Sequence, residues 1–262
     1  MQDEVTQRLE FAINAAREAG QLTLRYFQRD DLQVDVKRDA TPVTIADRES
    51  EKLLRERIAA AFPDDAVLGE ELGEKPGTSG YRWILDPIDG TKSFIHGVPL
   101  YAVLIGVEHT GQSEIGVIHM PALGETVYAA KGQGAWHTRG NQPKKPAGVS
   151  PAKSLSEGLF LTSGLAGFHR RGAWPFFERL TKTAKLTRTW GDAYGYLLVA
   201  TGRAELMIDP EINIWDAAAI LPIIEEAGGK YTDWRGNATI ASGEGIATNG
   251  LIHDEVLRML KQ

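Results

Sequence analysis

The segment from Trp83 to Phe94 constrains the fold of this chain more than any other. An apolar run ends in Asp86-Pro87-Ile88-Asp89-Gly90, where two carboxylates stand three residues apart. A buried strand that stops at Asp86 would bring both acids, with the Ile88 carbonyl between them, to one point at a sheet edge. These hard oxygen ligands suit a divalent cation such as Mg²⁺. An ordinary Pro/Asp/Gly turn uses the same residue types, so the rest of the chain must decide.

Size and composition narrow the class of protein. A chain of 262 residues can bury a large core, as one domain or as two packed lobes. Its net charge of -6 argues against a nucleic-acid partner, and the absence of cysteine excludes disulfides, thiolate zinc sites and a cysteine nucleophile. The N-terminus lacks the pattern of a signal peptide, and no apolar run approaches the roughly 18 residues of a membrane span. We therefore expect a cytoplasmic enzyme without a membrane partner.

The first half of the sequence predicts helices packed on an antiparallel sheet, an α+β arrangement. Apolar residues recur at helical spacing from Val5 to Leu22. A second helix is expected from Thr44, which can cap it together with Asp47, to Phe62 before Pro63. Strands are predicted at 66–68, 81–85, 102–107, 114–120 and 126–128.

A polar, proline-rich segment, 140–146, is the expected boundary between an N-terminal lobe (1–143) and a C-terminal α/β lobe (144–262). Beyond it, strands are predicted at 159–162 and 204–208, and helices at 175–183, 191–200 and 215–227. Pro222 should kink the last helix unless its neighbours compensate. The functional site is expected between the lobes.

Three further carboxylates occupy notable positions. Glu70 lies in a Gly-Glu-Glu turn after a short strand, Asp47 lies in the first turn of a helix, and Asp216 starts another helix, where the helix dipole favours an anion. Taken singly, each is explained by a helix cap or a surface turn, because the chain has 35 Asp and Glu residues.

Taken together, these motifs resemble one family. Gly69-Glu70-Glu71, the segment Asp86 to Thr91, and Trp215-Asp216-Ala217-Ala218 running on to Gly229 are similar to the inositol monophosphatase family of metal-dependent, lithium-sensitive phosphatases. The resemblance spans nearly the whole chain. It implies an α/β (α+β) fold, a layered α-β-α-β-α sandwich, and a homodimer.

The resemblance also implies roles for individual residues. Two or three Mg²⁺ ions would be bound by Glu70, Asp86, Asp89, Asp216 and the Ile88 carbonyl. Thr91 and Asp47 would hold the attacking water, and Glu70 would contribute to its activation. The backbone amides of Gly90 and Thr91 would hold the phosphate at a helix N-terminus. Metal ions can lower the pKa of a bound water and neutralise the leaving oxygen, so no covalent phospho-enzyme is required.

Residues outside the metal cluster are expected to select the substrate. The segments Lys92 to Leu100 and Arg188 to Tyr196 resemble histidinol-phosphate phosphatases of the bacterial and plant type. Histidinol phosphate carries an amine and an imidazole, so Asp192 and Asp209 would pair with these groups, with Asp89 and Asp216 also facing the substrate. Arg188 would add a planar donor fork. A local salt bridge between Arg188 and Asp192 is the alternative, and Asp209 stands where the family usually has the longer Glu.

The expected function is a Mg²⁺-dependent phosphomonoesterase, histidinol-phosphatase in histidine biosynthesis. The alternatives are inositol-1-monophosphatase and 3′-phosphoadenosine 5′-phosphate phosphatase, the latter because Lys92 follows Thr91. A different class, an inactive homologue that binds a phosphorylated ligand, is disfavoured because every metal carboxylate is present. None of the six histidines has the spacing of a metal-ligand pair.

Overall fold

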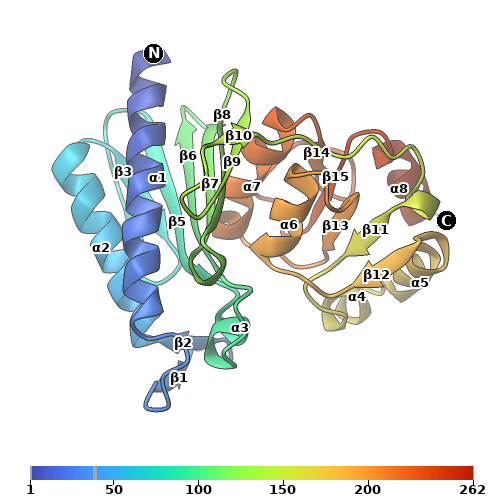
Figure 1. Cartoon of the computed structure of the whole chain (residues 1–262), viewed down its shortest axis with the longest axis horizontal. Helices are drawn as coiled ribbons and strands as arrows, with labels where there is room; N and C mark the ends of the chain where they lie inside the picture. The colour runs from blue at the N-terminus through green and yellow to red at the C-terminus, as the bar shows by residue number, and fades with distance from the viewer. Residues whose placement is uncertain (1, 38–39, 262) are drawn as a thin grey trace.

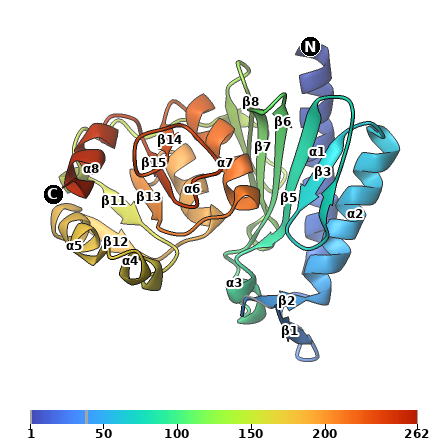
Figure 2. The ribbon, with the colours of Figure 1, turned by 180° about the vertical axis from the view of Figure 1, so that it is seen from behind.

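Two sheets divide the secondary structure into five layers, α-β-α-β-α, as the sequence predicts (Figures 1 and 2). The computed structural model describes residues 2–37 and 40–261. One outer layer holds α1 (Gln2–Leu24) and α2 (Ile45–Ala61), the middle layer α6 (Ala193–Ala200) and α7 (Ile214–Glu226), and the other outer layer α4 (Ala166–Arg170), α5 (Trp174–Thr183) and α8 (His253–Leu260). Within the described ranges, no helix is long and apolar enough to cross a bilayer.

The first sheet has eight strands in the order β10-β9-β8-β7-β6-β5-β3-β4. Their bounds are β3 (Ala66–Gly69), β4 (Gly73–Lys75), β5 (Tyr81–Asp89), β6 (Ala102–His109), β7 (Gln112–Met120), β8 (Glu125–Ala130), β9 (Ala135–Arg139) and β10 (Lys145–Pro146). All neighbours are antiparallel except β3 and β5, which are parallel, so the prediction of a purely antiparallel sheet is wrong at that pair. A separate hairpin of β1 (Val34–Val36) and β2 (Pro42–Thr44) leads into α2.

The second sheet has five strands, β12 (Leu186–Arg188), β11 (Leu159–Leu161), β13 (Leu206–Asp209), β15 (Gly245–Thr248) and β14 (Lys230–Thr232), in that order. The expected lobe boundary after residue 143 stays a prediction. β10 still pairs with β9 beyond it, and one apolar core joins both sheets through α6 and α7.

Two glycines let α7 lie directly on the first sheet. Gly106 in β6 and Gly116 in β7 face each other in the pairing register. A Cβ added at Gly116 would lie 2.0 Å from the Ala219 carbonyl oxygen, and one at Gly106 would lie 2.6 Å from the Ala218 Cβ. Only glycine therefore permits this approach, and α7 continues through Pro222 against the same surface.

Two predicted boundaries are wrong near the acids. β5 does not stop at Leu85 but continues to Asp89, with a register shift against β6 between Asp86 and Asp89. Such an irregularity accommodates Pro87, which has no N–H to donate, and changes the direction of neighbouring side chains. α6 begins at Ala193 rather than Gly191, because Asp192 has a φ of 49°, outside helical geometry.

Candidate metal centre and active site

Three carboxylates meet where β5 ends beside the start of α7. One oxygen from each of Asp86, Asp89 and Asp216 lies within 4.8 Å of the others. Asp86 is only 2 % exposed, and its Oδ1 accepts a hydrogen bond of 2.9 Å from the Ile88 amide. The irregular end of β5 therefore directs Asp86 and Asp89 to one place, as the sequence predicts, although both belong to the strand.

Capping boxes orient two of the predicted acids. Asp47 is the third residue of α2, and its Oδ2 accepts a hydrogen bond of 2.8 Å from the amide of the cap residue Thr44. Asp216 occupies the same position in α7, and its Oδ2 accepts one of 2.8 Å from the Asn213 amide. In each case the cap holds one carboxylate oxygen and leaves the other to point elsewhere.

Thr91 connects Asp47 to the end of β5. Its hydroxyl lies 3.4 Å from Asp47 Oδ1 and 3.2 Å from the Ile88 carbonyl oxygen. Thr91 is also the first residue of α3 (Thr91–Ile95), and Gly90 caps that helix with a φ of 83°. Amides in the first turn of a helix have no intrahelical acceptor, so they face outward toward this space.

Glu70 lies in the turn between β3 and β4. Its amide donates to the Leu85 carbonyl at 3.2 Å, and its Oε1 lies 2.7 Å from Lys37 Nζ. The fully buried Glu51 of α2 holds the turn, because its carboxylate accepts hydrogen bonds from the Glu71 amide (2.7 Å) and the Leu72 amide (3.1 Å).

The charges in this region fit a cation. Burial raises the pKa of Asp86, Asp89 and Asp216, and the proximity of neighbouring acids raises those of Asp86 and Asp89 further. A divalent cation among these oxygens would offset the repulsion between the carboxylates, and all the donors are the hard oxygens that such ions prefer. The residues therefore fit a metal ion.

The N-terminus of α6 forms the facing wall. The Ala193 amide donates to Asp89 Oδ2 at 2.5 Å, and the Asp192 amide donates to Ser163 Oγ at 2.9 Å. A Cβ added at Gly90 would lie 2.9 Å from Asp192 Oδ2, so glycine is needed there for space as well as for its positive φ. Burial raises the pKa of Asp192.

The structure does not bring every predicted substrate residue to this space. Asp209 is buried behind the wall, where its carboxylate accepts hydrogen bonds from the Tyr196 hydroxyl (2.8 Å) and the Ser163 amide (3.2 Å). Arg188 is exposed at the end of β12 and donates to the Thr187 carbonyl at 2.7 Å. In the described chain the alternative ion pair between Arg188 and Asp192 is not formed. Their substrate contacts stay predictions.

One cavity collects the remaining predicted residues except Asp47, which lies beside the lining residue Thr91. Of the residues expected from the sequence it is lined by Glu70, Asp86, Ile88, Asp89, Gly90, Thr91, Asp192 and Asp216. It is also lined by Lys92, whose role the sequence left open, and by Thr41, Pro42, Asn213 and Trp215. Asn213 was missed although its spacing from Asp216 repeats that of Thr44 from Asp47. Thr41 and Pro42 come from the hairpin before α2, and no local motif marks them.

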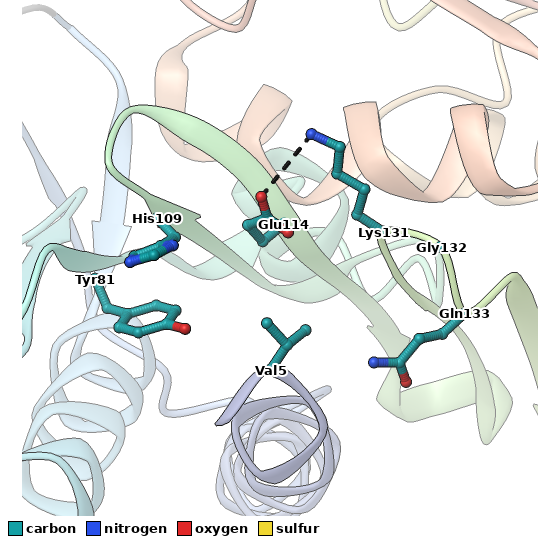
Figure 3. A pocket seen from close by; sticks show the side chains of 7 residues that line it. All are labelled: Val5, Tyr81, His109, Glu114, Lys131, Gly132 and Gln133. Carbon is teal, nitrogen blue, oxygen red and sulfur yellow. Dashed lines mark ion pairs between the residues drawn. The ribbon is translucent and has the colours of Figure 1, made fainter. Parts of the chain in front are cut away.

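A second cavity, drawn in Figure 3, lies at the other end of β5. Tyr81, the first residue of the strand, lines it and stacks on His109 with ring centroids 4.2 Å apart, while Glu114 and Lys131 form an ion pair of 3.9 Å. Asp89 lies eight residues after Tyr81 along the strand, a distance of roughly 26 Å. The cavity has no residue in common with the acidic site.

Comparisons with known proteins agree with this geometry. Residues 4–262 match the model of the inositol monophosphatase family. The chain is 46% identical to a histidinol-phosphatase of Chlorobaculum parvum, covering 93% of this chain and 92% of that protein, and 40% identical to a histidinol-phosphatase of Mycobacterium tuberculosis, covering 96% and 97%. A solved IMPase of Thermotoga maritima has a TM-score of 0.87 and 36% identity, covering 97% of each chain. The chain belongs to the inositol monophosphatase family.

Proposed function

We propose that this phosphoric monoester hydrolase is a Mg²⁺-dependent histidinol-phosphatase, which converts histidinol phosphate and water to histidinol and phosphate. The observation that carries the proposal is the single cavity in which Asp86, Asp89 and Asp216 face the Asp192 wall. One side of this cavity suits a metal-bound phosphate, and the other offers an acid to a cationic substrate.

The metal site is assigned to the chain's own oxygens. Glu70, Asp86, Asp89, Asp216 and the Ile88 carbonyl would hold two or three Mg²⁺ ions. When bound, such ions lower the pKa of a water, orient it and neutralise charge on the leaving oxygen. Lithium sensitivity is expected for the same site.

Thr91 and Asp47 would position the attacking water. The Thr91 hydroxyl donates toward Asp47 Oδ1 or the Ile88 carbonyl, so its lone pairs remain available to accept a hydrogen bond from water. Glu70 lies on the same cavity and can take up a proton as the water attacks. The outward-facing amides of Gly90 and Thr91 would hold the phosphate oxygens. No protein nucleophile is needed.

The substrate's cationic end is assigned to the α6 wall. Asp192 lies on the cavity, and its carboxylate can form a charge-assisted hydrogen bond with an amine or imidazole. Asp209 is hydrogen-bonded to the Ser163 amide, and the Asp192 amide donates to Ser163 Oγ, so Asp209 would act through this link. Arg188 stays a candidate at the outer edge.

Inositol-1-monophosphatase is the second candidate, because the similar Thermotoga maritima structure is named an IMPase. 3′-Phosphoadenosine 5′-phosphate phosphatase remains a further candidate because Lys92 lines the cavity. An inactive binding homologue is disfavoured because the full set of acids surrounds one space. We expect a cytoplasmic homodimer without a nucleic-acid or membrane partner.

Phosphate release from the three substrates tests the proposal. Purified protein with Mg²⁺ should show the highest kcat/KM for histidinol phosphate, compared with inositol 1-phosphate and 3′-phosphoadenosine 5′-phosphate. A preference for either of the latter would overturn the substrate and leave the chemistry intact. Activity that persists after complete removal of divalent metal would overturn the chemistry.

A further inference from the structure

A basic cavity lies at the opposite end of α6 from the catalytic cavity. It has a volume of about 380 Å³, and its polar lining includes Glu125, His137, Arg139, Lys145 and Arg203. Arg203 follows the C-terminal end of α6, whereas Asp192 precedes its N-terminal end, roughly 12 Å away along the helix. The two cavities have no lining residue in common.

Strand register places four of these side chains on one face of the first sheet. Glu125 in β8 lies opposite Arg139 in β9, and His137 in β9 lies opposite Lys145 in β10. Arg139 and His137 are two residues apart, so they point to the same side of the sheet. The arrangement therefore comes from regular pairing rather than from a loop.

Glu125, the acid at the buried base of the cavity, already has partners. Glu125, 1 % exposed, accepts hydrogen bonds on Oε1 from His137 Nε2 at 2.7 Å and from Arg203 at 2.6 Å. Burial lowers the pKa of His137, which keeps its ring neutral. The charges of Glu125 and Arg203 cancel each other, so the charges of Arg139 and Lys145 give the cavity an excess of positive charge.

These two cations have no polar partner among the described residues. In the described part of the chain, neither the Arg139 guanidinium nor the Lys145 ammonium has a hydrogen-bond or ion-pair partner. Two buried atoms beside them, His137 Nδ1 and Glu125 Oε2, also have none among the described residues. Buried polar atoms are nearly always hydrogen-bonded in folded proteins, so this cavity has capacity for both an anion and a donor.

We propose that this cavity is a second binding site for a small molecule that presents an oxyanion, either a phosphate or a carboxylate. Arg139 offers a planar fork of donors and Lys145 a compact positive charge, a pair that matches the oxygens of such groups. The half-exposed Arg203, although paired with Glu125, lines the same cavity and offers further N–H donors. The site is independent of the catalytic chemistry.

NMR of the full chain with Mg²⁺, labelled at histidine, tests the site. The imidazole signals of His137 should shift as inorganic phosphate or succinate is added, and the two titrations separate phosphate from carboxylate ligands. Arg139→Ala and Lys145→Ala should each weaken the binding seen at His137 by about tenfold. Both side chains are exposed and lie outside the catalytic cavity, so each variant should turn over histidinol phosphate at the wild-type rate. Unchanged turnover then shows that the variant is folded.

Lys144→Ala is the matched control. Lys144 is the neighbour of Lys145, but it lies over the Trp136 ring, 4.6 Å from the centroid, and does not line the cavity. Its removal should leave the binding unchanged. The proposal is overturned if His137 does not respond to either anion at about 20 mM, a concentration that reveals even millimolar affinity. It is equally overturned if Arg139→Ala and Lys145→Ala bind as the control does.

Discussion

Asp89 Oδ2 accepts a hydrogen bond of 2.5 Å from the backbone amide of Ala193, 104 residues further along the chain. The contact ties the acidic end of β5 to the first turn of α6, and so holds the metal side of the cavity against the Asp192 wall. The same carboxylate is close to Asp86 and Asp216. One residue therefore serves both the proposed metal site and the geometry of the substrate wall.

Asp89→Asn separates these two roles. Asparagine keeps an oxygen that can accept from the Ala193 amide, but it loses the charge. We expect kcat/KM to fall by more than about 100-fold, which exceeds the 10–100-fold loss typical when a residue that hydrogen-bonds a metal ligand is substituted. The Tm of the metal-free variant should be no lower than that of the metal-free wild type, because the substitution removes one negative charge from a cluster of closely spaced acids. Near-normal turnover would contradict the assignment.

Thr91→Val tests the positioned water. Valine has the shape of threonine without the hydroxyl that lies near Asp47 Oδ1 and the Ile88 carbonyl. We expect kcat to fall by about 100-fold or more while KM changes little. Ser93→Ala in the same helix is the control, because Ser93 does not line the cavity. Equal kinetics for the two variants would remove Thr91 from the mechanism.

Asp192→Asn tests substrate selection. Asparagine has the size and shape of the aspartate that already adopts the positive φ of this position, so the wall should keep its shape. Loss of the charge should lower kcat/KM for histidinol phosphate by about 10–100-fold. The value for inositol 1-phosphate, whose ring carries no cation, should fall much less. A parallel loss with both substrates would indicate a structural role.

Glu51→Gln tests how the Glu70 turn is held. Glutamine can accept only one of the two hydrogen bonds from the Glu71 and Leu72 amides, and it removes the negative charge that lies 2.7 Å from the Arg55 guanidinium. The free energy of unfolding should drop by about 3 kcal/mol, and half-maximal activity should need more Mg²⁺.

Glu56→Gln on the same helix is the matched control for Glu51. Glu56 is exposed and pairs only loosely with Lys52, at 3.9 Å, so its removal should change the unfolding free energy by less than about 1 kcal/mol. Urea unfolding and Mg²⁺ titrations of activity measure both variants. Indistinguishable variants would show that Glu51 does not position the turn.

His119 should make stability depend on pH. Burial lowers its pKa in the folded protein from 6.5 to about 4. Between these values the unfolded chain binds the proton more readily, so stability falls as the pH drops from about 6.5 to 4, by at most about 3 kcal/mol. Above pH 7 the residue contributes no pH dependence.

His119→Asn removes this titration and keeps a polar atom near the Thr126 hydroxyl, which lies 2.9 Å from His119 Nδ1. Urea unfolding at several pH values should show that the free energy of unfolding falls less steeply with decreasing pH in this variant than in the wild type. His96→Asn, at an exposed position, should keep the wild-type slope. A wild-type slope in His119→Asn would exclude His119 as the cause.

Local sequence patterns predicted much of the site because the hydrogen bonds and backbone geometry that they encode involve only a few neighbouring residues. The caps that orient Asp47 and Asp216 each act across three residues, and the Asp86-Pro87-Ile88-Asp89 pattern sets two acids at the end of a strand. The acids of the cavity could therefore be anticipated as candidates, whereas the layered architecture was expected from the resemblance to a known family. The ends of β5 and α6 could not, because a pairing irregularity and one positive φ decided them.

The sequence by itself determined the residue types of the site: hard oxygen ligands, a hydroxyl beside an acid, and turns that present them. Only the tertiary structure decided which of these residues meet. Arg188 and Asp209 have the right chemistry, yet one lies on an edge strand and the other behind Ser163. Asp216 reaches Asp86 because α7 rests on Gly106 and Gly116, contacts that depend on packing between segments about 100 residues apart and leave no local pattern.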